Sequence, residues 1–88
     1  MVNKVFADTG LEDYLYWQTE DRKTLKKINQ LIYDIARNRN NGLGKPVPLR
    51  GNLAGFWSRR INDKDRLIYK TDDNNIYILA CRYHYGDK

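Results

Sequence analysis

Apolar and polar residues alternate differently in the two halves of the chain, and the first half is typical of helices. After Asp21, apolar side chains recur three and four positions apart, which predicts an amphipathic helix ending in the Asn- and Gly-rich run 38–44. These positions are Leu25, Ile28, Leu31, Ile32 and Ile35. Before this helix, residues 2–6 are expected to form a short strand. Thr9 and Glu12 have the spacing of a capping box, so Thr9 is expected to begin a first helix that ends near Gln18.

From residue 45 onward the pattern favours strands. Pro46 and Pro48 require extended backbone, because proline restricts both its own conformation and that of its predecessor. Three strand candidates follow at 55–61, 66–71 and 76–84, separated by short turn-forming runs. Short connections predict an antiparallel meander. Two helices before three consecutive strands indicate a single α+β domain over residues 1–88, with helices on one sheet face and the other face open.

Charge is concentrated in the strand-forming half. The chain of 88 residues has a net charge of +5. Residues 1–44 hold seven positive and six negative side chains, whereas residues 45–88 hold nine and five. This excess predicts an anion-binding surface, although a plain solvated basic face remains the alternative. The basic residues between positions 45 and 70 are Lys45, Arg50, Arg59, Arg60, Lys64, Arg66 and Lys70.

The single cysteine, Cys81, excludes an internal disulfide and a cysteine-based metal site, so we expect a reducing compartment and neither a metal nor a cofactor. The N-terminal residues lack the apolar stretch of a signal peptide, and no run approaches the roughly 20 apolar residues of a membrane span. The sequence is therefore expected to be cytoplasmic, with no membrane partner.

His84 is the only histidine and the first candidate for chemistry. Strict alternation along the last strand would place it on one face with Ile76, Ile78, Ala80 and Arg82. Such a face turns from apolar to polar at its end, as expected for a strand that enters a cleft. An imidazole titrates near pH 6.5 and can act as a general acid at neutral pH. Taken alone, His84 can equally be an ordinary surface residue.

Three arginines on the two preceding strands are candidates for binding phosphate. If residues 62–65 are all loop, Arg66 shares a sheet face with Arg59, and a slip of one residue replaces Arg59 by Arg60. The sequence leaves this register open. Aromatic residues nearby can stack on bases of single-stranded RNA, although Trp57 can equally belong to the core. These aromatic residues are Trp57, Tyr83 and Tyr85.

Several motifs together resemble the YoeB toxins over essentially the whole chain. They are Tyr14-Leu15-Tyr16-Trp17-Gln18, Lys26-Lys27-Ile28-Asn29, Gly44-Lys45-Pro46, Gly55-Phe56-Trp57-Ser58-Arg59-Arg60-Ile61 and Cys81-Arg82-Tyr83-His84-Tyr85. The resemblance implies a RelE-like (microbial RNase-like) fold, with an N-terminal strand and two helices packed on an antiparallel sheet. It also implies a toxin that enters the ribosomal A site and cuts messenger RNA without a metal, neutralised by a YefM-type antitoxin. Homodimer formation and contact with operator DNA through the antitoxin complex stay open.

Residue roles follow from the same resemblance. It implies His84 as general acid, Arg66 as transition-state clamp and Tyr85 as the residue that orients the substrate. Arg50 and Arg60 fall at phosphate-contacting positions of the family, and Lys45 and Arg59 belong to the same basic group. The implied reaction is attack of a ribose 2′-hydroxyl on the adjacent phosphate with loss of the 5′-oxygen.

One residue departs from the family pattern. The family usually has a glutamate between the two prolines as general base, and this chain has Val47. Loss of a positioned base costs about 10² to 10⁴ in rate, so reduced activity is expected. Val47 can be natural in an attenuated toxin, can be a substitution selected or introduced because active toxin harms its host, or can be offset by another base. The alternative function is a catalytically inactive protein that binds ribosomes, RNA or the antitoxin as co-repressor.

Overall fold

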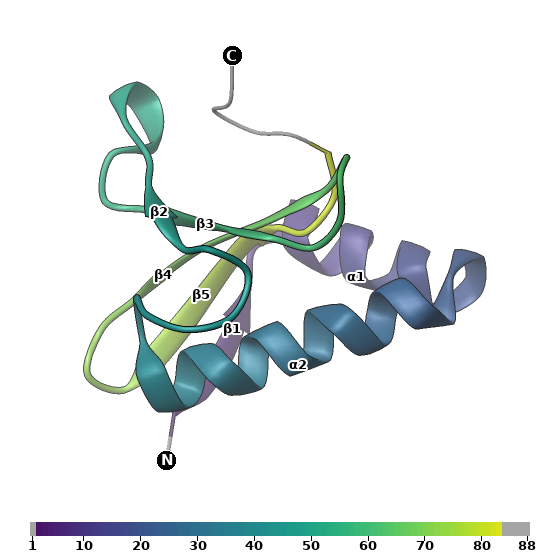
Figure 1. Cartoon of the computed structure of the whole chain (residues 1–88), viewed down its shortest axis with the longest axis horizontal. Helices are drawn as coiled ribbons and strands as arrows, with labels where there is room; N and C mark the ends of the chain where they lie inside the picture. Colours follow the sequence, from purple (N-terminus) through teal and green to yellow (C-terminus); the bar gives the residue numbers. More distant parts are fainter. Residues whose placement is uncertain (1, 84–88) are drawn as a thin grey trace.

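Two helices lie side by side on one face of a five-stranded sheet in the computed structural model, which describes residues 2–83 (Figure 1). The elements in chain order are β1 (Asn3–Phe6), α1 (Asp8–Glu20), α2 (Arg22–Asn38), β2 (Val47–Pro48), the short 3₁₀ turn η1 (Gly51–Leu53), β3 (Trp57–Arg60), β4 (Arg66–Thr71) and β5 (Asn75–Ala80). The sheet order is β1-β5-β4-β3-β2. The predicted α+β architecture and the antiparallel meander of β3, β4 and β5 are confirmed. The sheet is mixed, because β1 runs parallel to β5.

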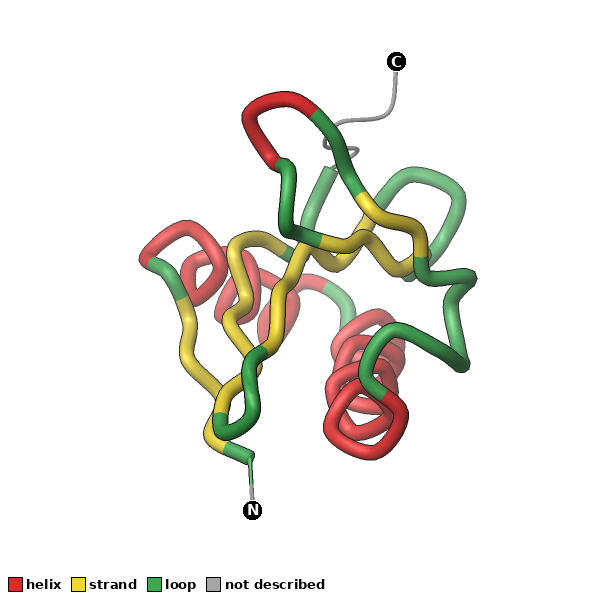
Figure 2. The backbone as a smooth tube through the Cα atoms, turned by 90° about the vertical axis from the view of Figure 1, so that its left-hand side faces the viewer, coloured by secondary structure: helices red, strands yellow, loops and turns green. Residues whose placement is uncertain are grey.

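The core lies between α2 and the inner face of the sheet. The predicted apolar stripe of α2 is confirmed, since Ile28, Leu31, Ile32 and Ile35 are buried. Each such side chain contributes about 1.5–3 kcal/mol when fully buried. Their partners on the other elements are Trp17, Ile61, Leu67, Tyr69, Ile76, Ile78 and Cys81. In Figure 2, η1 projects beyond the sheet on the side away from α2. No helix within residues 2–83 has the length and apolar character of a membrane span.

The first helix begins differently from the prediction. It starts at Asp8 after Ala7, which makes no side-chain cap, so Thr9 lies inside the helix and the predicted capping box is wrong. The reason is the sheet. The amide of Ala7 donates to the carbonyl of Ile78 (3.0 Å), and the carbonyl of Ala7 accepts the first helical bond, from Leu11 (2.9 Å). The ladder between β1 and β5 therefore leads directly into α1.

The second helix has a true side-chain cap. The Asp21 carboxylate accepts hydrogen bonds from the amides of Lys23 (3.1 Å) and Thr24 (3.2 Å) and from the Thr24 hydroxyl (2.8 Å). These bonds satisfy amides that have no partner within the helix. The hydrogen bonds from Thr24 lower the pKa of Asp21 below its ordinary value. The predicted start after Asp21 is thus confirmed.

A β-bulge corrects the predicted alternation of the last strand. Tyr69 pairs with Ile78, but the adjacent Ile68 pairs with Ala80, so Leu79 is an extra residue in β5. Ala80 therefore faces away from Ile78, and Cys81 returns to the core. The strand ends at Ala80, not at residue 84. The alternation was also used to predict the sheet face of His84, but His84 lies outside the described residues.

Candidate functional site

The register between β3 and β4 determines which arginine lies next to Arg66 on the sheet face opposite the helices. Arg60 pairs directly with Arg66, so their side chains lie on the same face. Arg60 is exposed and forms an ion pair with Asp63 (2.5 Å). Arg66 is half-buried, and its Nη1 donates to the backbone carbonyls of Asn62 (2.7 Å) and Asp65 (3.0 Å). Arg60, not Arg59, therefore lies beside Arg66.

Arg59 points to the helix side, and the prediction that it binds phosphate is wrong. It is 0% exposed. Its Nη1 contacts the Asp34 carboxylate at 2.5 Å. The guanidinium also donates to the Tyr69 hydroxyl and to the backbone carbonyls of Arg39, Asn41 and Leu43. These bonds fasten the connection after α2 to β3, and the hydrogen bond from Arg59 lowers the pKa of Asp34. Arg59 is thus a structural residue with no free donor surface.

Position 47 lies near the arginine pair on the sheet face that carries no helix, which we call the open face. Val47 pairs with Ser58, which is two residues before Arg60 in β3 and therefore on the same face. Val47 is 49% exposed. A side chain at this position thus points toward the solvent side of the sheet that carries Arg60 and Arg66.

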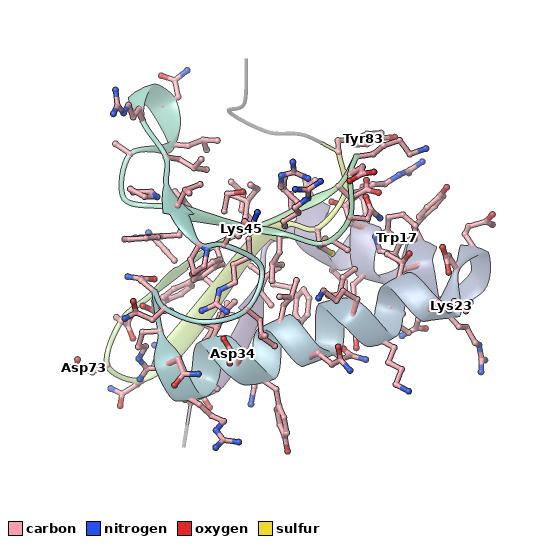
Figure 3. All side chains as sticks on the ribbon, in the orientation of Figure 1. Trp17, Lys23, Asp34, Lys45, Asp73 and Tyr83 are labelled. Atoms are coloured by element: carbon pink, nitrogen blue, oxygen red, sulfur yellow. The ribbon has the colours of Figure 1, made fainter. Side chains whose placement is uncertain are left out.

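The two other basic candidates flank β2. Lys45 and Arg50 are both exposed, and Figure 3 labels Lys45 in the connection between α2 and β2. This connection lies beside β3, because the carbonyl of Gly44 accepts a hydrogen bond from the amide of Arg60 (2.7 Å). Gly44 and Lys45 both have positive φ, at 80° and 51°, which turns the chain sharply before β2. Lys45 and Arg50 remain candidates for contact with phosphates.

The three aromatic candidates for base stacking differ in burial and in whether the structure describes them. Trp57 pairs with Tyr69 on the inner face and packs, partly buried, against the core, which supports its core interpretation. Tyr83 is 55% exposed, and the Arg82 guanidinium lies 4.6 Å from its ring centroid. Tyr85 and His84 fall outside the described residues. Of the predicted aromatic surfaces, the described part of the chain therefore offers Tyr83.

A hollow of about 230 Å³ adds aromatic surface that the sequence reasoning missed. Phe56 and Tyr77 contribute rings to its lining, and the Lys70 ammonium lies 5.1 Å and 5.5 Å from their centroids. Rings next to a cation are a surface on which bases stack. Lys70 and Tyr77 meet because the strand register pairs them, which the sequence pattern did not reveal. Within residues 2–83, no cluster of three His, Cys, Asp or Glu side chains has the arrangement of metal ligands.

Two buried carboxylates near the end of β5 were also missed. Asp13 accepts a hydrogen bond from the amide of Cys81 (3.0 Å), and Asp65 accepts one from the amide of Tyr83 (2.8 Å). Burial raises the pKa of Asp13 above its ordinary value. Burial also raises the pKa of the Cys81 thiol to about 12, which leaves it protonated and unreactive at neutral pH. The spacing of Asp13 and Trp17, four residues apart on one helix face, was the available signal.

Known proteins place the chain in one family. Residues 6–85 match the family described as "YoeB-like toxin of bacterial type II toxin-antitoxin system". Toxin YoeB of Streptomyces coelicolor is 54% identical over 80 residues, which cover 91% of this chain and 95% of that protein.

Solved structures agree with this match. The YoeB dimer from Staphylococcus aureus superimposes with a TM-score of 0.90 at 49% identity, covering 96% of this chain and 98% of that one. The YoeB-YefM complex from the same organism gives 0.89 at 48% identity, covering 97% and 99%. The expected RelE-like fold is therefore confirmed, and the chain belongs to the family of YoeB-like toxins of bacterial type II toxin–antitoxin systems.

Proposed function

We propose that this toxin is a ribosome-dependent, metal-independent endoribonuclease that cuts messenger RNA and so inhibits translation. The observation that carries the proposal is the pairing of Arg60 with Arg66 on the open sheet face, with position 47 on the same face. Two arginines on the same face of neighbouring strands suit the phosphates of an RNA strand, because a guanidinium presents donors in a fork that matches phosphate oxygens. The rings of Phe56 and Tyr77 offer neighbouring stacking surface.

The proposed reaction is an internal transesterification. The ribose 2′-oxygen attacks the adjacent phosphorus, a new bond to that oxygen forms, and the bond to the 5′-oxygen breaks. The His84 imidazolium gives its proton to the leaving 5′-oxygen, and the products are a cyclic phosphate and a 5′-hydroxyl. Arg66 binds the phosphate oxygens on which negative charge grows, and Tyr85 orients the substrate. Arg50, Arg60 and Lys45 hold flanking phosphates.

Val47 removes the expected acceptor for the 2′-hydroxyl proton. Valine has no group that takes up a proton, so that proton must pass to water or to another base. We infer a cleavage rate reduced by about 10² to 10⁴ relative to a chain with glutamate here. Val47 is exposed on a two-residue edge strand, so the valine leaves the core and the arginine pair as they are.

We also infer that a YefM-like antitoxin binds this toxin and that two toxin chains can form a homodimer. The support is that the S. aureus structures are a YoeB-YefM complex and a YoeB dimer, at 48% and 49% identity. An acidic, partly disordered antitoxin segment would suit the basic open face and fold on binding. Contact with operator DNA would then pass through the antitoxin.

The test maps messenger 5′ ends on translating ribosomes for the unmodified chain and for the Val47→Glu and His84→Ala variants. We expect slow cleavage by the unmodified chain, cleavage at least 100-fold faster with Val47→Glu, and none with His84→Ala. Leu43→Glu is the matched control. Leu43 is 50% exposed, like Val47, and the substitution introduces the same negative charge in a loop.

Two results would count against the proposal. If Val47→Glu cleaves no faster than the unmodified chain, position 47 does not hold the missing base. If cells stop growing while messenger ends stay unchanged for both chains, the alternative of a non-catalytic protein that binds ribosomes or acts with the antitoxin as co-repressor is favoured.

A further inference from the structure

The segment 81–83, directly before His84 and Tyr85, is held by side chains from two distant parts of the chain. We propose that Asp13, Trp17 and Asp65 are positioning residues for the RNA-cleavage reaction, because they hold the backbone of Cys81 and Tyr83 directly before His84 in the sequence. This inference rests on the proposed ribonuclease function and names the residues that act on its general acid indirectly.

Side chains of helix α1 form hydrogen bonds with both the amide and the carbonyl of Cys81. The Asp13 carboxylate accepts from the Cys81 amide (3.0 Å), and the Trp17 indole Nε1 donates to the Cys81 carbonyl (2.8 Å). All three residues are buried. Residue 81 has left the ladder of β5, yet its backbone is bonded in the interior, where an unpaired polar group is costly. The chain is therefore fixed one residue beyond the end of the strand.

Asp65, the last residue before β4, and Arg66, the first residue of β4, bind the backbone of Tyr83. Its amide donates to the buried Asp65 carboxylate (2.8 Å), and its carbonyl accepts from the amide of Arg66 (2.9 Å). Tyr83 has a φ of 69°, a left-handed conformation that non-glycine residues rarely adopt. Such a backbone persists where surrounding contacts impose it. These two bonds hold Tyr83 in this turned conformation.

The residue between these two anchors is packed as well. The Arg82 guanidinium lies 3.5 Å from the ring centroid of Tyr16 in α1 and 4.6 Å from that of Tyr83. A guanidinium over an aromatic ring is an attractive contact. Three consecutive residues thus carry contacts that fix their position, and α1 supplies part of them.

The turn between β3 and β4 also fixes Arg66. The Asn62 side-chain oxygen accepts from the amides of Lys64 and Asp65 (2.8 Å each), which closes the turn. The carbonyls of Asn62 and Asp65 accept from the Arg66 guanidinium. The turn therefore sets the relation between the phosphate clamp and the segment that leads to the general acid. A misplacement of about 1 Å between such groups can cost 10²-fold in rate.

The test compares Asp65→Ala with Asp65→Asn in single-turnover cleavage of ribosome-bound messenger. Thermal unfolding and hydrogen exchange at the Tyr83 amide are measured on the same proteins. We expect Asp65→Ala to lower the maximal rate by about 10- to 100-fold, with the half-saturating concentration within threefold. The exchange rate of the Tyr83 amide should rise at least tenfold. Asp65→Asn should restore both quantities to within about threefold, because its amide oxygen still accepts the hydrogen bond.

Two further variants complete the design. Asp73→Ala removes an exposed aspartate from the other strand connection and should leave rate and exchange unchanged. Trp17→Phe keeps most of the ring but removes the donor to Cys81, so it should lower the maximal rate without changing the half-saturating concentration. If Asp65→Ala fails to fold, the rate of Trp17→Phe tests the positioning proposal in its place.

The proposal is overturned if folded Asp65→Ala keeps its maximal rate within twofold, or if the exchange of the Tyr83 amide does not respond to it. It is also overturned if Trp17→Phe cleaves as fast as the unmodified chain. Should the unmodified chain not cleave at all while Tyr83 exchange depends on Asp65, the ribonuclease function fails and the anchoring contacts stand.

Discussion

The ion pair between Arg59 and Asp34 offers the sharpest test of what holds the fold together. Asp34→Ala removes the carboxylate from a guanidinium that is 0% exposed. The guanidinium keeps its carbonyl partners and the Tyr69 hydroxyl, but its charge is then unpaired in the interior. The variant also removes the acceptor for the Leu43 amide (3.0 Å).

The size of the effect follows from burial. Removing one partner of a buried ion pair typically costs about 3–5 kcal/mol. The Asp34 side chain is 15% exposed, which favours the lower end of that range. We therefore expect a loss of about 3 kcal/mol in the free energy of unfolding. For a domain of this size, each kcal/mol shifts the melting temperature by about 4–8 °C, so the expected drop is roughly 12–24 °C.

The matched control is Asp63→Ala. Asp63 and Arg60 form an ion pair with the same 2.5 Å separation, but their side chains are 92% and 46% exposed. Exposed pairs contribute about 0–1 kcal/mol, so this variant should melt close to the unmodified chain. Urea and thermal unfolding, followed by circular dichroism, measure both. Equal losses in the two variants would refute the reasoning, because burial would then not decide the cost.

Acid titration gives the same pair a second test. The hydrogen bond from Arg59 holds the pKa of Asp34 below its ordinary value of 3.8. A carboxylate with a lowered folded-state pKa contributes stability that is present above its unfolded value and lost as the pH falls through the folded value. The stability difference between the unmodified chain and Asp34→Asn should thus be constant from pH 5 to 8 and shrink below about pH 4. A difference that persists to pH 2 would contradict this assignment.

Two other predictions concern the contact of α1 with β5. A Cβ at Gly10 would clash with the carbonyl oxygen of Ile78; Gly10→Ala should therefore destabilise by more than about 2 kcal/mol in urea unfolding despite its better helix propensity, whereas Thr9→Ala should stay within about 0.5 kcal/mol. A stable Gly10→Ala would show that α1 shifts freely on the sheet. The buried Cys81 thiol, with its pKa raised to about 12, should resist iodoacetamide at pH 8 until urea unfolds the chain. Mass spectrometry measures the labelling, and rapid alkylation of the native protein would contradict the burial.

The parts of the fold that the sequence predicted are those with local causes. The α2 helix carries its own stripe of apolar residues and its own cap at Asp21, so its start and its buried face follow from neighbours three and four positions away. Short connections rich in turn formers likewise predicted the meander. Thr9 failed as a cap because the partner that decides the start of α1 is Ile78, far away in the chain.

The candidate site was less predictable because one residue of register changes every face. The bulge at Leu79 comes from pairing between β4 and β5 and has no signal in alternation alone. Arg59 illustrates the same limit. Arginine is normally exposed, and only the folded connection after α2 brings together the three carbonyls and the carboxylate that bury it.

Arg59 and Arg60 therefore divide between a structural role, seen for Arg59, and the role in phosphate binding that we propose for Arg60. They are adjacent in β3, so they point to opposite faces, one into a buried ion pair and one beside Arg66 on the open face. Val47 lies on the face of Arg60, so under the proposed mechanism a substitution there affects the reaction and not the core. Under the proposed function, glutamate at this position would raise the reaction rate without changing the core, and valine would leave the proposed RNA-binding and antitoxin-binding surfaces in place. The anchors Asp13 and Asp65 are the exception, because they are buried like Arg59 and yet, in our proposal, act on the reaction as positioning residues.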